Sequence, residues 1–172
     1  GLLGGKIIVA GGMRGFLAAS LDPDPLRTVE VFDPVTKTWE TAASTTGAPD
    51  KSLEDLPQAR HSPGSVIVPK GVFGKGSGEV LVIGGGYGSK GGLRTVIALG
   101  DSVGAKWTAM PHLAVARMGL SLAVARNCLY AMGGMTQDVA KHASPDGASP
   151  ITATVEKFCP KRTVEASRQS EL

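Results

Sequence analysis

The sequence has few cysteines, no long hydrophobic run and no block of like charge. No apolar run approaches the ~20 residues that a membrane-spanning helix needs, so no membrane span is predicted. The net charge of +3 comes from scattered Lys and Arg, which gives no reason to expect a nucleic-acid partner. Two Cys in 172 residues exclude a disulfide-rich scaffold. No secretory signal pattern is visible at the start, and we therefore expect an intracellular, cytoplasmic protein.

Glycine is the residue type in excess. The chain has 24 Gly and 11 Pro, which predicts many turns and short elements and makes long helices a poor expectation. The glycines cluster instead of recurring at every third position, which excludes a collagen pattern. Hydrophobic residues make up 42% and charged residues 19%, a composition that favours a packed core.

An internal repeat is the main signal. Three short apolar runs, at residues 6–12, 79–85 and 128–134, each end in a pair of glycines. Their length and punctuation are typical of buried strands. The glycine pairs are therefore expected to have structural roles, at Gly11, Gly12, Gly84, Gly85, Gly133 and Gly134.

Further elements follow the same repeat. Leu-Arg-Thr-Val at residues 26–29 recurs letter for letter at residues 93–96, and residues 28–34 recur loosely at residues 154–160. β-branched residues and alternation predict strands here. Trp39 and Trp107 follow in the first two units, and Arg60 and Arg117 each precede an apolar strand.

Taken together, these motifs resemble the kelch repeat over about residues 5–165. The resemblance implies an all-β fold, a β-propeller whose blades are four-stranded antiparallel sheets. The expected units are a first blade at residues 1–43 without its innermost strand, a second at 44–110, a third at 111–165 with a degenerate last strand near 163–166, and a polar tail at 166–172. Propellers typically have 4–8 blades, so three blades form an incomplete ring, which we expect to be completed in a larger assembly.

A binding face is predicted from loop lengths. Successive strands of a blade reverse direction, so the long segments 13–26, 43–57 and 135–152 fall on one face, and loops on a rigid scaffold often carry function. The candidate partner-binding residues on this face are Arg14, Arg60, His61, Tyr87, Lys90 and Arg117, with Lys141 and His142 nearby. The resemblance implies that arginines at such positions bind acidic peptide motifs, since Arg suits carboxylates. The alternative is that both strand-entry arginines only pack between blades.

Two further pairs of residues have structural interpretations. Trp39 and Trp107 are expected to be core residues that wedge against a neighbouring blade. Alignment of the repeats puts Cys128 and Cys159 where Lys6 and Asp33 stand, so the charged pair could form an ion pair and the cysteines could form a disulfide. The alternative, two reduced thiols, is favoured in the absence of a secretion signal.

Motifs for chemistry are weak. Residues 86–91 fit G-x-G-x-x-G, but a strand-like run follows where a nucleotide site needs a helix. His61, His112 and His142 lack metal-ligand spacing. We therefore predict no catalytic residue, metal or cofactor, and expect a protein-interaction or scaffold module within a complex. One alternative is a segment of a kelch-fold enzyme, galactose-oxidase-like or sugar-modifying, with its catalytic residues elsewhere. Another is a purely structural subunit.

Overall fold

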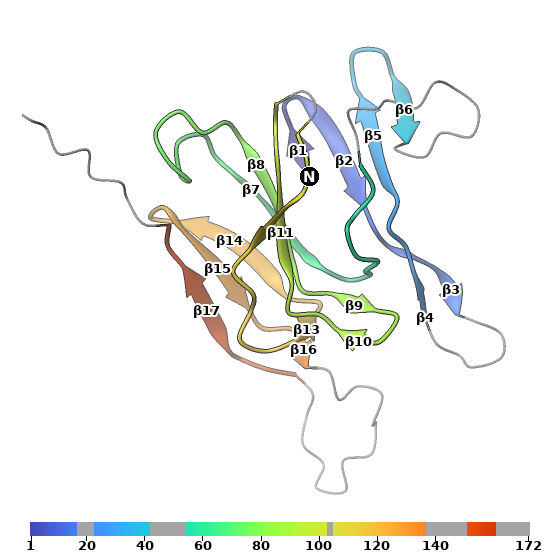
Figure 1. Cartoon of the computed structure of the whole chain (residues 1–172), viewed down its shortest axis with the longest axis vertical. Coiled ribbons are helices and arrows are strands. Elements are labelled where there is room, and N and C mark those ends of the chain that lie inside the picture. Colours follow the sequence, from blue (N-terminus) through green and yellow to red (C-terminus); the bar gives the residue numbers. More distant parts are fainter. Residues whose placement is uncertain (17–22, 42–53, 103–104, 137–150, 161–172) are drawn as a thin grey trace, which may run out of the picture.

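The strands of the chain form three antiparallel sheets that stand next to one another as blades (Figure 1). The computed structural model describes residues 1–16, 23–41, 54–102, 105–136 and 151–160. The first blade has the order β1 (Leu2–Leu3), β2 (Lys6–Ala10), β5 (Val29–Asp33), β6 (Thr38–Thr41). The second has the order β7 (Gly64–Val68), β8 (Val80–Gly84), β11 (Val96–Gly100), β12 (Thr108–Met110). The third consists of β14 (Ser121–Ala125), β15 (Cys128–Met132) and β17 (Val155–Phe158).

The all-β prediction is confirmed, and the described strands do not close a ring. Within the described residues, no helix is long and apolar enough to cross a membrane. The first blade does have an innermost strand, contrary to prediction: β1 pairs Leu2 with Ile7 and Leu3 with Lys6. The degenerate strand expected near 163–166 lies outside the described residues.

Two apolar layers hold the blades together. One layer joins the first and second blades and includes Ile8, Val31, Leu81 and Leu99. The other joins the second and third blades and includes Val82, Ala98, Leu120 and Leu129. Among the described sheets, only that of the second blade is covered on both faces, which is why β8 and β11 are buried along most of their length while burial alternates along β2. Burial of apolar area between the sheets is thus the main stabilising contribution.

A pair of short strands extends from each blade at the same end of the molecule. These hairpins are β3 (Met13–Phe16) with β4 (Pro23–Pro25), β9 (Tyr87–Gly88) with β10 (Gly91–Gly92), and β13 (Arg117–Met118) with β16 (Met135–Thr136). They lie together at the lower end of Figure 1, and we call this end the loop face. The expectation that the segments after the glycine pairs share one face therefore agrees with the arrangement of these hairpins.

The second glycine pair is displaced by one residue from its predicted position. The amides of Gly11, Gly85 and Gly133 donate to the equivalent carbonyls of Thr28, Thr95 and Thr154. All three glycines and the glycine after each have positive φ, so Gly86 belongs to the pair. Gly84 instead ends β8 and lacks this conformation, so it closes the strand while the turn pair is Gly85 and Gly86. The run Gly84-Gly85-Gly86 left the register ambiguous in the sequence.

The two residue pairs that the repeat alignment equated, Lys6 with Asp33 and Cys128 with Cys159, form different kinds of contact. Lys6 and Asp33 form an ion pair of 3.5 Å, which confirms their predicted contact. Asp33 also accepts from the amides of Val35 and Thr36, and these hydrogen bonds, followed by the charge of Lys6, lower its pKa. Cys128 and Cys159 form a disulfide with a Cα separation of 4.3 Å, so the favoured expectation of reduced thiols is wrong. Disulfides persist mainly in oxidising compartments, and the bridge therefore does not support the predicted cytoplasmic location.

The two tryptophans differ in burial. Trp107 packs against the layer between the first two blades, and its Nε1 donates to the carbonyl of Glu54. This agrees with the predicted structural role. Trp39 is 56% exposed, so the prediction of a core position is wrong for this residue within the chain. The two tryptophans lie on equivalent faces of their blades. The face of the second blade packs against the first blade, whereas no described sheet covers that face of the first blade.

Replacement of Gly85 by Ala should destabilise the protein more than replacement of Gly71. Both glycines have positive φ, and the backbone strain alone costs about 1–2 kcal/mol in each variant. A Cβ at Gly85 would also clash with the carbonyl of Arg117, whereas a Cβ at Gly71 would meet nothing within 4 Å. We expect the loss in unfolding free energy for Gly85→Ala to be at least about twice that for Gly71→Ala in urea titrations. Equal losses would show that the close approach is not maintained in solution.

Candidate functional site: inter-blade arginines and the open face of the first blade

Each linker between blades is fastened to the preceding blade by the same hydrogen bonds, which we call the inter-blade clasp. In the first clasp the amides of Leu56 and Arg60 donate to the carbonyls of Arg27 and Leu26, and Arg27 Nε donates to the Leu56 carbonyl at 2.7 Å. The second clasp joins the linker residues Leu113 and Arg117 to residues 93–94, with Arg94 Nε at 2.7 Å from the Leu113 carbonyl. The identical Leu-Arg-Thr-Val repeats therefore have a structural reason, which sequence reasoning did not find.

Arg60 enters the second blade from this clasp with a fully buried side chain. Its Nη1 donates to the carbonyls of Gly85 and Thr95 at 3.0 and 3.3 Å, and its Nη2 donates to Thr95 Oγ1. Removal from water disfavours the charged form and lowers the pKa of Arg60 to about 10. The guanidinium remains charged at neutral pH and crosslinks two segments of one blade.

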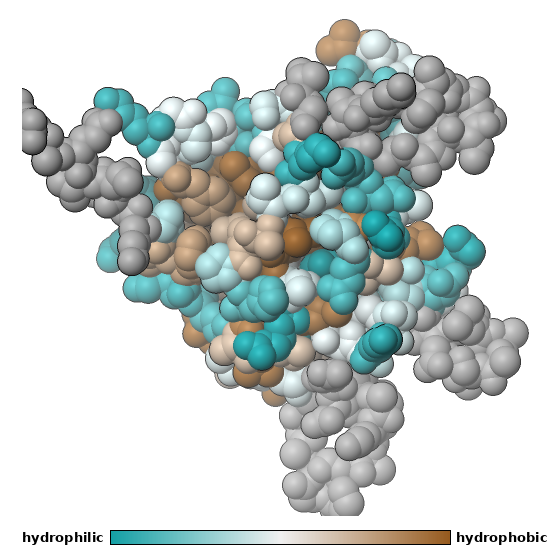
Figure 2. All heavy atoms as spheres, viewed as in Figure 1, coloured by the Kyte–Doolittle hydropathy of each residue, from teal (hydrophilic) through white to brown (hydrophobic). Residues whose placement is uncertain are grey.

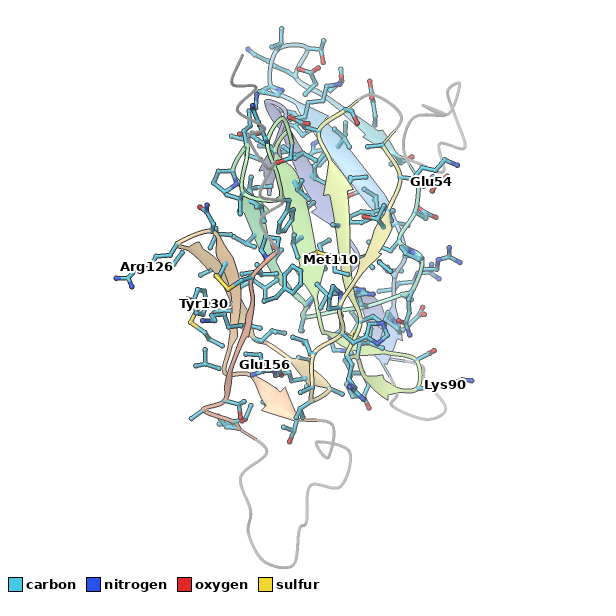
Figure 3. The ribbon with its side chains drawn as sticks, turned by 60° about the vertical axis from the view of Figure 1, so that its left-hand side comes forward. Glu54, Lys90, Met110, Arg126, Tyr130 and Glu156 are labelled. Atoms are coloured by element: carbon cyan, nitrogen blue, oxygen red, sulfur yellow. A yellow bond between two sulfur atoms is a disulfide. The ribbon has the colours of Figure 1, made fainter. Side chains whose placement is uncertain are left out.

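Arg117 occupies the same place in the third blade. Its Nη1 donates to the carbonyls of Gly133 and Thr154, at 3.0 and 2.8 Å. Its Nη2 lies 2.6 Å from Glu156 Oε1, and Glu156 Oε2 accepts from the amide of Ala114 in the linker. Figure 3 shows Glu156 on β17. The guanidinium is thus neutralised by a carboxylate of its own blade.

The prediction that Arg60 and Arg117 contact a partner is wrong for this structure. Both side chains have no exposed surface, and their Nη1 and Nη2 atoms donate to groups of their own blades. The alternative stated above, that both arginines only pack, agrees with their full burial, although their guanidinium hydrogen bonds lie within their own blades and do not cross to a neighbouring blade. A ligand arginine and a structural arginine precede a strand in the same way, so the sequence pattern did not distinguish them.

The other predicted partner-binding residues lie on the loop face. His61 and Tyr87 are brought together by a pair of backbone hydrogen bonds, and their rings are 5.4 Å apart. His61 Nδ1 lies 3.1 Å from Ser62 Oγ, while its Nε2 is buried without a hydrogen-bond partner among the described residues. This burial lowers the pKa of His61.

Arg14 and Lys90 are exposed at separate hairpins and do not join this pair. Arg14 forms an exposed ion pair of 3.6 Å with Asp24 across the β3–β4 hairpin. Lys90 extends outward from the β9–β10 hairpin (Figure 3). Lys141 and His142 lie outside the described residues. The predicted residues therefore give two solvent-exposed cations and one pair of tilted rings in contact on the loop face, with no converging cluster among them.

The first blade has a face that no other described sheet covers, and we call it the open face. A row of apolar side chains crosses all four strands on it, because Leu2 pairs with Ile7, Ile7 with Phe32, and Phe32 with Trp39. The Phe32 and Trp39 rings are 5.1 Å apart. Val9 lies on the same face, and Leu2, Ile7, Val9 and Trp39 are all exposed. Sequence analysis missed this surface, since alternation shows that a face exists but not what covers it.

The equivalent row of the second blade is buried. When the glycine pairs are aligned, Ile67, Leu81, Leu99 and Trp107 match Leu2, Ile7, Phe32 and Trp39. Leu81 and Leu99 are buried against the first blade, and Ile67 and Trp107 pack beside them. The open face is therefore the same surface that, one blade later, receives the preceding blade.

Glu30 is the acidic residue of the open face. It is exposed on β5, opposite Val9 of β2 and Thr41 of β6. Within the described residues its carboxylate has no ion-pair or hydrogen-bond partner. The recurrence of Thr-Val-Glu at residues 28–30 and 154–156 was the available signal, because it equates Glu30 with the Glu156 that binds Arg117.

Polar and apolar surface are distributed unevenly in the remaining hollows. A groove between the second and third blades is lined by Met110, Leu113, Leu129 and Phe158, with Glu156 at its edge. These residues belong to the interface already described.

Figure 2 shows apolar atoms gathered over the part of the molecule where β7, β8 and β14 lie in Figure 1, with polar atoms frequent near the loop face. In the described part of the chain, no group of three or more His, Cys, Asp or Glu residues could hold a metal ion.

Comparison with protein families assigns the first of these units. Residues 1–46 match the family model described as the Kelch motif. This match covers the first blade. The second and third blades repeat its glycine-to-threonine hydrogen bonds, so the kelch resemblance and its blade architecture are confirmed. No curated protein matches the chain.

Arg117→Ala should destabilise the protein strongly. The substitution leaves the Glu156 carboxylate without its buried partner, and breaking such a pair costs about 3 kcal/mol. The control is Arg14→Ala, which removes an exposed ion pair and should cost less than about 1 kcal/mol. Unfolding free energies from chemical denaturation measure both effects. If both variants lose similar amounts, the buried geometry of Arg117 is not present in solution.

Acidification should destabilise the native state through His61. Its folded pKa lies below the ordinary value near 6.5, so the unfolded state binds more protons between these two values. Stability is therefore lost as the pH falls from 6.5 through the folded pKa, and His61→Gln should reduce this loss. NMR titration of the ring proton gives the folded pKa directly. A midpoint at or above 6.5 would contradict the expected desolvation.

Proposed function

We propose that this chain is a protein-interaction module that binds a protein partner through the open face of its first blade, as one part of a larger assembly. The kelch motif is in general associated with protein interaction, which is the broader basis for the proposal. The observation that carries it is the exposed apolar row Leu2–Ile7–Phe32–Trp39, whose equivalent in the second blade is buried by a neighbouring blade.

The chemistry of this surface favours a protein over a small ligand. The row is spread across a flat sheet of four strands and includes two aromatic side chains in contact. Aromatic anchors within a flat apolar patch are typical of protein interfaces, and contiguous apolar surface rimmed by polar groups marks such sites. Trp39 would then become the core residue that its sequence position predicted, once a partner sheet covers it.

The loop face is a second surface through which the same module could bind. Tyr87, Lys90 and Arg14 are accessible there and stand on hairpins held by rigid blades. The open face is the better supported of the two surfaces, because exposure of its apolar side chains to water is unfavourable and burial against a partner would remove that cost. The expectations that the chain has no catalytic residue and no cofactor remain predictions, as does the enzyme alternative.

Ile7→Asp should disrupt the assembly without unfolding the chain. Ile7 lies in the middle of the apolar row and is exposed, so a carboxylate there has little effect on the isolated blade but opposes burial in an interface. We expect the native particle to be larger than one chain for the wild type and to have the mass of one chain for the variant. Sedimentation velocity of the native particle measures both.

Val35→Asp is the matched control. Val35 is 88% exposed in the turn between β5 and β6, away from the apolar row, and its replacement should leave the particle unchanged. Acrylamide quenching of Trp39 fluorescence, in a Trp107→Phe background, should be weaker in the particle than in the isolated chain. A wild-type particle with the mass of one chain and a freely quenched Trp39 would refute the proposal.

A further inference from the structure

The connection between β7 and β8 is an insertion in the blade repeat. It covers residues 69–79, whereas the equivalent connections before β2 and before β15 cover only residues 4–5 and 126–127. A short turn is thus enough to join these two strands of a blade. Insertions in repeat proteins map to loops on one face, and that face is often the binding face. The insertion lies at the end of the molecule opposite the loop face (Figure 1).

Internal contacts hold this insertion in place. The amide of Gly71 donates to the carbonyl and the hydroxyl of Ser77, at 3.0 and 3.1 Å. The amide of Ser77 in turn donates to the carbonyl of Gly74 at 3.1 Å. Val72 and Phe73 are partly buried and pack against the apolar layer between the second and third blades. The insertion is therefore anchored on a packed sheet, and the surface that it presents is preformed.

A hollow of about 730 Å³ lies between the insertion and the third blade. Residues 71–75 line it on the side of the insertion, and residues 126–128, 159 and 160 line it on the side of the third blade. The Cys128–Cys159 disulfide joins the start of β15 to the residue after β17, which ties together the two segments of this second wall. Volumes of roughly 300–1,000 Å³ are typical of small-molecule sites, so the hollow has the size for such a ligand.

The polar side chains that line the hollow carry hydrogen-bond donors without partners. They are Lys75 of the insertion and Arg126 and Asn127 of the turn between β14 and β15, and none has an ion pair or hydrogen bond within the described residues. The backbone amides of Phe73 and Lys75 likewise donate to no acceptor in the described chain. Arg126 extends from its turn into solvent, which places it at the rim (Figure 3). No Asp or Glu is among the described lining residues, so the charges favour an anion.

We propose that this hollow binds a small amphiphilic anion, whose apolar body lies against Val72 and Phe73 and whose anionic head group meets Lys75 and Arg126. One cation comes from each of two blades, so the ligand contacts both of them. Apolar lining with a few charged groups that fix orientation is the usual composition of small-molecule sites. The site is separate from the open face and does not depend on the proposed function.

The dye 8-anilinonaphthalene-1-sulfonate is the first probe, because it combines an aromatic body with one sulfonate and becomes fluorescent when it leaves water. Fluorescence titration of the native chain measures its affinity, and we expect saturable binding. Lys75→Gln and Arg126→Gln should each weaken binding about threefold, and the double variant about tenfold, because each change removes one exposed charge contact.

Lys70→Gln is the matched control. Lys70 is an exposed lysine of the same insertion that does not line the hollow, so this variant should bind the dye as the wild type does. Arg126→Lys keeps the positive charge and should retain most of the affinity. The uncharged dye N-phenyl-1-naphthylamine should bind the wild type and the double Gln variant equally, since it has no head group for the two cations.

Competition distinguishes the possible head groups. Phenylacetate, phenyl sulfate and phenyl phosphate carry the same ring with a carboxylate, a sulfate or a phosphate. At least one of them should displace the sulfonate dye at a lower concentration than uncharged benzyl alcohol does, and the strongest competitor identifies the head group that the two cations prefer. Equal displacement by all four compounds would contradict recognition of an anion.

The remaining outcomes are equally decisive. Absence of saturable dye binding, or an affinity unchanged in the double Gln variant, would overturn the inference. Equal losses for Lys70→Gln and Lys75→Gln would also overturn it, because they indicate general attraction to basic surface. Loss of binding in Ile7→Asp would place the dye on the open face instead. None of these results depends on the mass of the native particle, so the proposed function is tested separately.

Discussion

The inter-blade clasp is the interaction on which the rest of the structure depends. Each linker crosses from one blade to the next while its backbone groups would otherwise lie unpaired near the core, a costly arrangement. The side chains of Arg27 and Arg94 donate hydrogen bonds to carbonyls of the linkers. The amides of Gly12 and Gly86 donate to the carbonyls of Arg60 and Arg117. Only glycine permits this approach, because a Cβ at Gly11 or Gly85 would meet an arginine carbonyl.

The buried arginines are a consequence of this geometry. Once the linker is fastened, the side chain of its last residue points into a cage of carbonyl oxygens, where a guanidinium with five donors can satisfy several acceptors at once. Arg117 adds a carboxylate to the cage and so avoids an unpaired buried charge. The arginines that motif reasoning assigned to a partner are thereby used within the chain.

The stack has two different ends because its repeats are not equivalent. The first blade keeps the apolar row of an inner blade, whereas the third blade has Lys157, Val155 and the Cys128–Cys159 bridge toward the outside. Val155 and Met132 pair on the outer face of the third blade and are exposed beside Lys157, so that face is only partly polar. An exposed apolar sheet face is stabilised when another sheet covers it.

Repeat spacing was enough to predict most strands of the three blades and the ion pair of Lys6 with Asp33, because strand alternation and glycine turns are local properties of the chain. The blade architecture was implied by the resemblance to the kelch repeat, and the innermost strand β1 was missed. Local signals also placed Trp39 in a core, which is wrong within the described chain, and they left open which two of Gly84, Gly85 and Gly86 form the turn pair. The burial of Trp39 depends on a neighbouring sheet, and the register of Gly84 depends on which glycine amide meets Thr95. The tertiary structure decided the burial of Arg60 and Arg117, the joining of the two cysteines and the exposure of Glu30. These features depend on contacts between segments far apart in the sequence. The chemical type of a side chain does not by itself determine which groups surround it in the folded structure.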